Sequence, residues 1–149
     1  MKKIIIIISS YIIIFFNSNL LSDDKNEILK IGLLAPLTGE YKELGNSLLY
    51  SLQLALDEIG DDKVFIIPRD SGLNDKEKLN NAIQDIQSQG VKVVIGPINY
   101  EDFAEVKKYG DIVFISPSNI TPEFTNNIIS IGISLESQLT TIFAFLKKQ

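Results

Sequence analysis

The sequence predicts an α/β fold, a parallel sheet flanked by helices, and three observations support it. Apolar runs typical of strands alternate at least four times with apolar residues at helical spacing. The runs lack strict alternation of apolar and polar residues, which is typical of strands buried on both faces. The chain has 149 residues, enough for one domain with a sizeable core. Such alternation requires right-handed crossovers between parallel strands.

The first predicted strand runs from Leu29 to Leu34, and the loop 35–39 follows it. A long amphipathic helix is predicted from near Glu40 and ends at Gly60. Its apolar residues recur in steps of three and four, at Tyr41, Leu44, Leu48, Leu52, Ala55 and Ile59.

The later elements repeat this order with different lengths. Strands are predicted at 64–67, 91–95 and 112–115, and residues 128–131 fit a fifth strand. The helices between and after them are marked by apolar residues at helical spacing: Leu79, Ala82, Ile83 and Ile86 before Gly90, then Phe103, Val106 and Tyr109, then Leu135, Leu139, Ile142, Phe143 and Leu146.

The N-terminus has the layout of a secretory signal peptide, with basic Lys2 and Lys3 before an apolar run from Ile4 to Phe16. The 13 residues of that run would cover about 20 Å as a helix, short of the roughly 30 Å hydrocarbon core. We therefore expect a signal peptide at 1–22, a mature domain at 23–149 and a periplasmic location. An uncleaved membrane anchor is the alternative.

Composition excludes several classes of function. Without the signal peptide the chain keeps 12 basic and 19 acidic residues, a net charge of −7, which argues against nucleic acid as a partner. The chain has no Cys and no His, so disulfides, thiol chemistry and the commonest metal ligand and general base are missing. It has no glycine-rich phosphate loop and no nucleophile elbow. We expect no enzyme, catalytic residue, metal or cofactor.

Ligands of open α/β sheets bind at the carboxyl ends of the strands, so the loops after the strands are the candidate site. Thr38 precedes a helix start that could hold an anion, or it could cap that helix. Asn99 could contact a ligand or cap the next helix. Ser116, Ser118 and Asn119 suit a zwitterion or sugar, and equally suit a turn. Arg69 and Asp70 could meet a charged ligand or form an exposed ion pair.

Four motifs occur in order along the mature chain: 31–45 with Ala-Pro-Leu-Thr-Gly, 69–72 with Arg-Asp-Ser-Gly, 93–97 with Val-Val-Ile-Gly-Pro, and 114–118 with Phe-Ile-Ser-Pro-Ser. In these motifs the chain resembles the type I periplasmic binding proteins of the leucine, isoleucine and valine group. The resemblance implies two α/β lobes with a ligand in the cleft between them. It also implies that this chain is an N-terminal lobe, apparently truncated, with the second lobe missing.

The resemblance further implies a non-catalytic, extracytoplasmic solute-binding protein of the ABC-transporter type. Its ligand would be an amino acid or a similar small polar metabolite, and its closed form would dock on a membrane permease. By position in the family's loops, the ligand-binding residues would be Thr38, Tyr41, Asn99, Tyr100, Ser116, Ser118 and Asn119.

The penicillin-binding-protein activators are a second branch of the same fold that the chain resembles. The motif 31–45 is also similar to the opening of their domain, which contacts a peptidoglycan synthase. Those proteins are commonly lipid-anchored through a cysteine, and this chain has no cysteine. The alternative function is therefore regulation of peptidoglycan synthesis.

Overall fold

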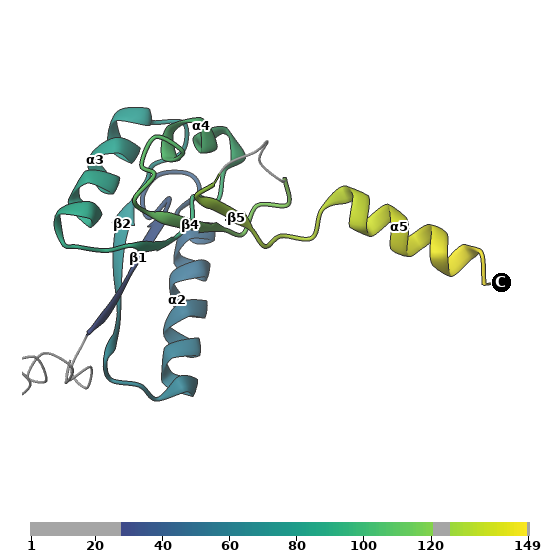
Figure 1. The fold of residues 1–149 in the computed structure, drawn as a ribbon, viewed down its shortest axis with the longest axis horizontal. Coiled ribbons are helices and arrows are strands. Elements are labelled where there is room, and N and C mark those ends of the chain that lie inside the picture. Colours follow the sequence, from purple (N-terminus) through teal and green to yellow (C-terminus); the bar gives the residue numbers. More distant parts are fainter. Residues whose placement is uncertain (1–27, 121–125, 149) are drawn as a thin grey trace, which may run out of the picture.

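The computed structural model describes residues 28–120 and 126–148, so the expected signal peptide at 1–22 lies outside the described residues. Five parallel strands form one sheet in the order β2-β1-β3-β4-β5. Figure 1 shows the fold of the chain. The prediction of a parallel α/β sheet is confirmed, and so is the fifth strand. The strands are β1 (Leu29–Ala35), β2 (Val64–Asp70), β3 (Val93–Ile95), β4 (Val113–Ser116) and β5 (Ile128–Ser130).

The helices follow the predicted order. They are α2 (Lys42–Ile59), α3 (Lys76–Ser88), the 3₁₀ turn η2 (Tyr100–Asp102), α4 (Phe103–Val106) and α5 (Leu135–Leu146). The largest difference from prediction lies in β2, which continues three residues beyond Ile67 because it pairs with β1 along its whole length. Pro68 is tolerated there because β2 lies at the edge of the sheet.

The core lies between the sheet and α3 with α4. The strand register places Gly32, Val94, Phe114 and Ile128 in one row on that face of the sheet. Buried side chains of α3, among them Ile86, pack against this row. A Cβ atom on Gly32 would lie 3.0 Å from side-chain carbons of both Ile86 and Val94, so a glycine lets α3 approach the sheet closely.

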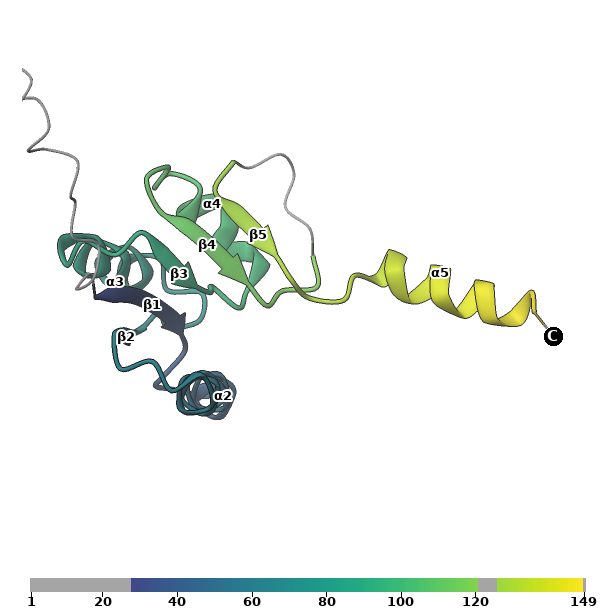
Figure 2. The same ribbon diagram turned by 60° about the horizontal axis from the view of Figure 1, so that its bottom comes forward.

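The opposite face of the sheet is covered by α2 near β1 and β2. Figure 2 shows α2 on the other side of the sheet from α3. The first turn of α2 packs tightly, because a Cβ atom on Gly45 would lie 2.1 Å from the carbonyl oxygen of Pro36. This contact fixes the start of α2 beside the loop that follows β1.

α5 extends away from the sheet and buries none of its residues (Figures 1 and 2). Apolar side chains of this helix are exposed, including Leu135, Leu139, Ile142, Phe143 and Leu146. Val113 and Ile129 are exposed as well, on the sheet face opposite α3. No helix in the described part of the chain has both the length and the apolar run needed to cross a membrane.

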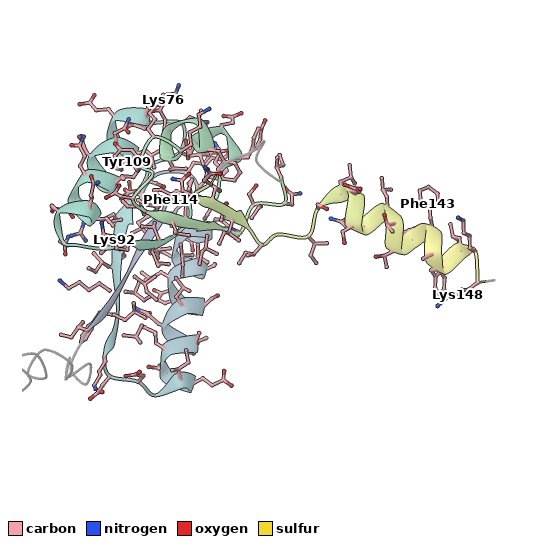
Figure 3. All side chains as sticks on the ribbon, viewed as in Figure 1. Lys76, Lys92, Tyr109, Phe114, Phe143 and Lys148 are labelled. Carbon is pink, nitrogen blue, oxygen red and sulfur yellow. The ribbon has the colours of Figure 1, made fainter. Side chains whose placement is uncertain are left out.

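Two phenylalanines, both labelled in Figure 3, test this division between core and projecting helix. Phe114 is fully buried in the core, whereas Phe143 on α5 is exposed. Phe114→Ala should lower the free energy of unfolding by about 3–5 kcal/mol, because it leaves a cavity. Phe143→Ala should change it by less than about 0.5 kcal/mol. Urea unfolding of both variants measures the difference, and equal losses would contradict the assignment of the core.

Candidate functional site

The strand order reverses beside β1, which is the place where open α/β sheets bind ligands. β1 pairs with β2 on one side and β3 on the other. The connections that leave β1 and β3 therefore run to opposite faces of the sheet, and a crevice can form between them at the carboxyl ends. The loop after β1 covers 36–41, and the loop after β3 covers 96–99.

Asp70, the last residue of β2, organises this edge of the sheet. Its Oδ1 accepts hydrogen bonds from the backbone N–H groups of Leu37 and Gly72, each at 3.0 Å. Its Oδ2 accepts a hydrogen bond from the Thr38 hydroxyl and one from Lys78 Nζ, the latter at 2.6 Å. The carboxylate therefore joins the loop after β1, the turn after β2 and the first turn of α3.

The protonation of Asp70 follows from these contacts. Burial alone would raise the pKa of this carboxyl, but the hydrogen bonds from Lys78, Thr38 and two backbone N–H groups outweigh burial and hold the pKa well below its usual range. Asp70 is therefore ionised at any physiological pH, and Lys78 balances its charge.

An open hollow of about 440 Å³ lies over this cluster, a size that suits a small solute. The lining combines hydroxyl, ammonium, carboxylate and aromatic side chains with backbone of the two loops. It consists of Thr38, Gly39, Glu40, Tyr41, Gly72, Leu73, Asn74, Asp75 and Lys78. Gly39, Gly72 and Asn74 have positive φ angles of 80°, 60° and 59°, which shape the two loops around the hollow.

Asn99 joins the loop after β3 to the turn after β2. Its Nδ2 donates to Asn74 Oδ1 at 3.1 Å, and its Oδ1 accepts from the Glu101 N–H at 3.2 Å. The second bond caps η2, which confirms the interpretation of Asn99 as a cap. Tyr100 follows it and is 48% exposed.

The polar residues at the end of β4 and after it form hydrogen bonds mainly with backbone groups of the protein itself. Ser116 is fully buried, and its hydroxyl donates to the Pro97 carbonyl at 2.6 Å and accepts from the Ser118 N–H at 3.1 Å. The Ser118 hydroxyl accepts from the Ile120 N–H at 3.2 Å. Asn119 is exposed. These bonds fit the turn interpretation, and they tie the loop after β4 to the loop after β3.

The structure corrects two sequence-based interpretations. Thr38 does not cap α2, because the N-cap position is Tyr41, which makes no side-chain capping bond, and the Thr38 hydroxyl donates to Asp70 instead. Arg69 and Asp70 do not pair with each other. Arg69 pairs with Asp85 on α3, and Asp70 pairs with Lys78.

Of the predicted ligand residues, the structure brings Thr38 and Tyr41 together at the hollow, and Asn99 reaches its rim through Asn74. Sequence reasoning missed Asn74 and Lys78. Near these two residues, only Asp75 could have been recognised from the sequence, as a typical N-cap residue before a helix. In the structure its side chain does cap α3, by accepting from the Lys78 N–H at 3.0 Å. Within 28–120 and 126–148, no group of three or more His, Cys, Asp or Glu residues could hold a metal ion.

Comparison with known proteins gives a family and a fold. A family model described as periplasmic binding protein matches residues 28–149. No curated protein sequence matches the chain. The isoleucine complex of the branched-chain amino acid transporter substrate-binding protein LivJ from Streptococcus pneumoniae is similar at 24% identity and a TM-score of 0.51, over 60% of this chain and 28% of that one.

Two further solved structures are similar. A solute-binding protein of an ABC transporter from R. palustris, in complex with benzoate, shares 25% identity and a TM-score of 0.52, over 60% of this chain and 27% of that one. Full-length LpoA from Haemophilus influenzae shares 19% identity and a TM-score of 0.61, over 80% of this chain and 23% of that one. The chain thus spans about a quarter of the length of each of these structures.

Replacement of Asp70 tests its role as the organising group. Asp70→Asn should lower the free energy of unfolding at pH 7 by about 2 kcal/mol. The amide nitrogen that replaces Oδ2 is a donor and cannot accept the hydrogen bonds of Thr38 and Lys78. Asp85→Asn is the matched control, since its ion pair with Arg69 is exposed and should be worth less than about 1 kcal/mol.

The difference in the free energy of unfolding between wild type and Asp70→Asn should become smaller as pH falls. Because the pKa of Asp70 is lower in the folded state, its contribution is complete above the unfolded pKa of about 3.9 and is lost as pH falls through the folded pKa. Urea titrations between pH 7 and pH 2 measure the difference. A gap that is constant down to pH 2, or one that widens, would contradict this account.

Proposed function

The chain belongs to the family of periplasmic binding proteins, and we propose that it is a non-catalytic, extracytoplasmic solute-binding protein of the ABC-transporter type. The observation that carries the proposal is the polar hollow at the carboxyl ends of β1 and β2, built around Asp70. In this proposal residues 1–22 direct export to the periplasm. The solute is an amino acid or a similar small polar metabolite.

The side chains at the hollow suit recognition without covalent chemistry. Tyr41 lines the hollow and is 45% exposed, so its ring can contact a solute. Tyr100 is 48% exposed and follows Asn99 in the loop after β3, and in this proposal it contacts the solute from that loop. Thr38 and Asn99 add hydroxyl and amide groups whose positions are set by Asp70 and Asn74. Selectivity would come from this hydrogen-bond pattern.

The residues after β4 have different roles in the proposal. Asn119 is exposed and would contact the solute from the loop after β4, whereas Ser118 is buried and its hydroxyl accepts from the Ile120 N–H. Ser116 supports the loops from inside, because its hydroxyl is buried against the Pro97 carbonyl. The solute would be held between this lobe and a second lobe, and the closed form would dock on a membrane permease.

Regulation of peptidoglycan synthesis, through contact with a synthase, is the second candidate. The burial of Ser116 favours it, because one fewer hydroxyl is left for a solute. Half-exposed tyrosines such as Tyr41 and Tyr100 are also typical of protein interfaces. The two candidates differ in whether a small molecule binds at the hollow.

A thermal-shift screen of the full chain separates them. The probes are L-isoleucine, L-glutamate and benzoate, which differ in charge and size. A solute that binds the folded state should raise the melting temperature, by an amount that increases with its concentration. Tyr41→Ala should abolish this shift, because it removes an aromatic wall of the hollow.

Tyr50→Ala is the matched control. Tyr50 is 62% exposed on α2 and is not part of the lining, so this variant should keep the full shift. An equal loss in both variants would refute the location of the site. Capture of a peptidoglycan synthase by a chain that no probe stabilises would favour the second candidate.

A further inference from the structure

Asp102 carries a buried carboxyl group in the short helical segment after β3. It is the last residue of η2, precedes α4 and is only 6% exposed. Within the described part of the chain, its carboxyl oxygens have no hydrogen-bond or ion-pair partner. Asp70 and Asp75, by contrast, each accept hydrogen bonds. A buried carboxylate without such contacts is expensive in free energy.

The charges around Asp102 do not compensate it. Glu101 and Glu105 lie on the same short helical segment, and Lys76 approaches from α3. Lys76 pairs with Glu105 at 3.7 Å, and Lys108 pairs with the same glutamate at 2.6 Å, so both cations form their ion pairs with Glu105 and not with Asp102. Burial, and then the charges of Glu101 and Glu105, raise the pKa of Asp102 to about 6 against the smaller opposing effect of Lys76.

The segment that holds Asp102 is small. η2 has three residues and α4 has four. The Asp102 N–H donates to the Asn99 carbonyl at 3.2 Å, and the Asn99 side chain caps η2 while it bonds to Asn74. Destabilising Asp102 therefore loosens the loop after β3, including Tyr100, before it affects the sheet.

We propose that Asp102 makes the segment 99–106 a pH-sensitive element. When the carboxyl group is protonated, the segment keeps the packed arrangement described above, which we call its closed form. When the carboxyl group is ionised, the segment loosens to an open form. Asp102 has a raised pKa in the closed form, so its stabilising contribution is complete below the pKa of the open form, about 3.9, and is lost as pH rises through about 6. In the closed form Asn99 is held against Asn74 at the rim of the hollow. The effect on solute affinity rests on the proposed function, but the pH dependence does not.

Amide hydrogen exchange of the full chain, followed by NMR without any ligand, tests the proposal. Between pH 5 and pH 7 the protection factor of the Asp102 N–H, corrected for intrinsic exchange, should fall about tenfold in the wild type. In Asp102→Asn it should stay constant, because an amide does not titrate. Asp57→Asn, which removes an exposed acid from α2, should show the wild-type fall.

Locality is tested on the same samples. The Gly96 N–H, which donates to the Ile115 carbonyl at 2.8 Å, should keep its protection over this pH range. The proposal is overturned by constant protection of Asp102 in the wild type, by the same fall in Asp102→Asn, or by an equal fall at Gly96. If Asp102→Asn does not fold, direct NMR titration of the Asp102 carboxyl in the wild type decides, and a midpoint below pH 4.5 overturns the proposal.

Discussion

Three segments meet at the carboxylate of Asp70: the loop after β1, the turn after β2 and the first turn of α3. Their donors come from far apart in the sequence, with Leu37 and Thr38 before the strand and Lys78 after it. The first two of these segments lie outside the regular helices and strands, and α3 begins only at Lys76. Their common geometry therefore depends on one acid that remains ionised because four donors surround it.

The hollow is a consequence of this arrangement and of the sheet order. β1 and β2 are neighbours in the sheet, so the loops that follow these two strands meet and line the hollow, and the contact between Gly45 and Pro36 fixes the start of α2 beside the loop after β1. Asp70 then holds the opposite side, with Lys78 and the turn at Gly72. The hollow presents an aromatic ring and polar groups whose loops are joined by hydrogen bonds to Asp70, and this arrangement is suited to reversible binding because little has to be ordered when a solute arrives.

The sequence predicted the fold well because apolar periodicity reports burial directly. The order of strands and helices is confirmed along the described chain, including the fifth strand at β5. Boundaries were less accurate, since the extension of β2 to Asp70 depends on pairing with β1 and not on local apolarity. The close approaches at Gly32 and Gly45 also require knowledge of which elements pack together.

The site was only partly predictable, for a physical reason. Loop residues such as Thr38 and Asn99 were identified because they follow strands, but their partners depend on contacts between loops. Asp70 and Thr38 are 32 positions apart, and Asn74 and Asn99 are 25 apart, so no local pattern reports either bond. Ser116 shows the converse. Its place at the end of a strand predicted contact with a ligand, whereas in the structure its hydroxyl is buried and donates to the Pro97 carbonyl.

The central claim is that the hollow organised by Asp70 binds a small solute. The most direct measurement is NMR titration of the isotope-labelled full chain with small polar solutes, following the amides of Leu37 and Gly72, which donate to Asp70. The account predicts saturable shifts at these amides and at Thr38–Tyr41, with the α5 amides unchanged. Saturable binding that shifts other residues and leaves Leu37 and Gly72 unperturbed would contradict it.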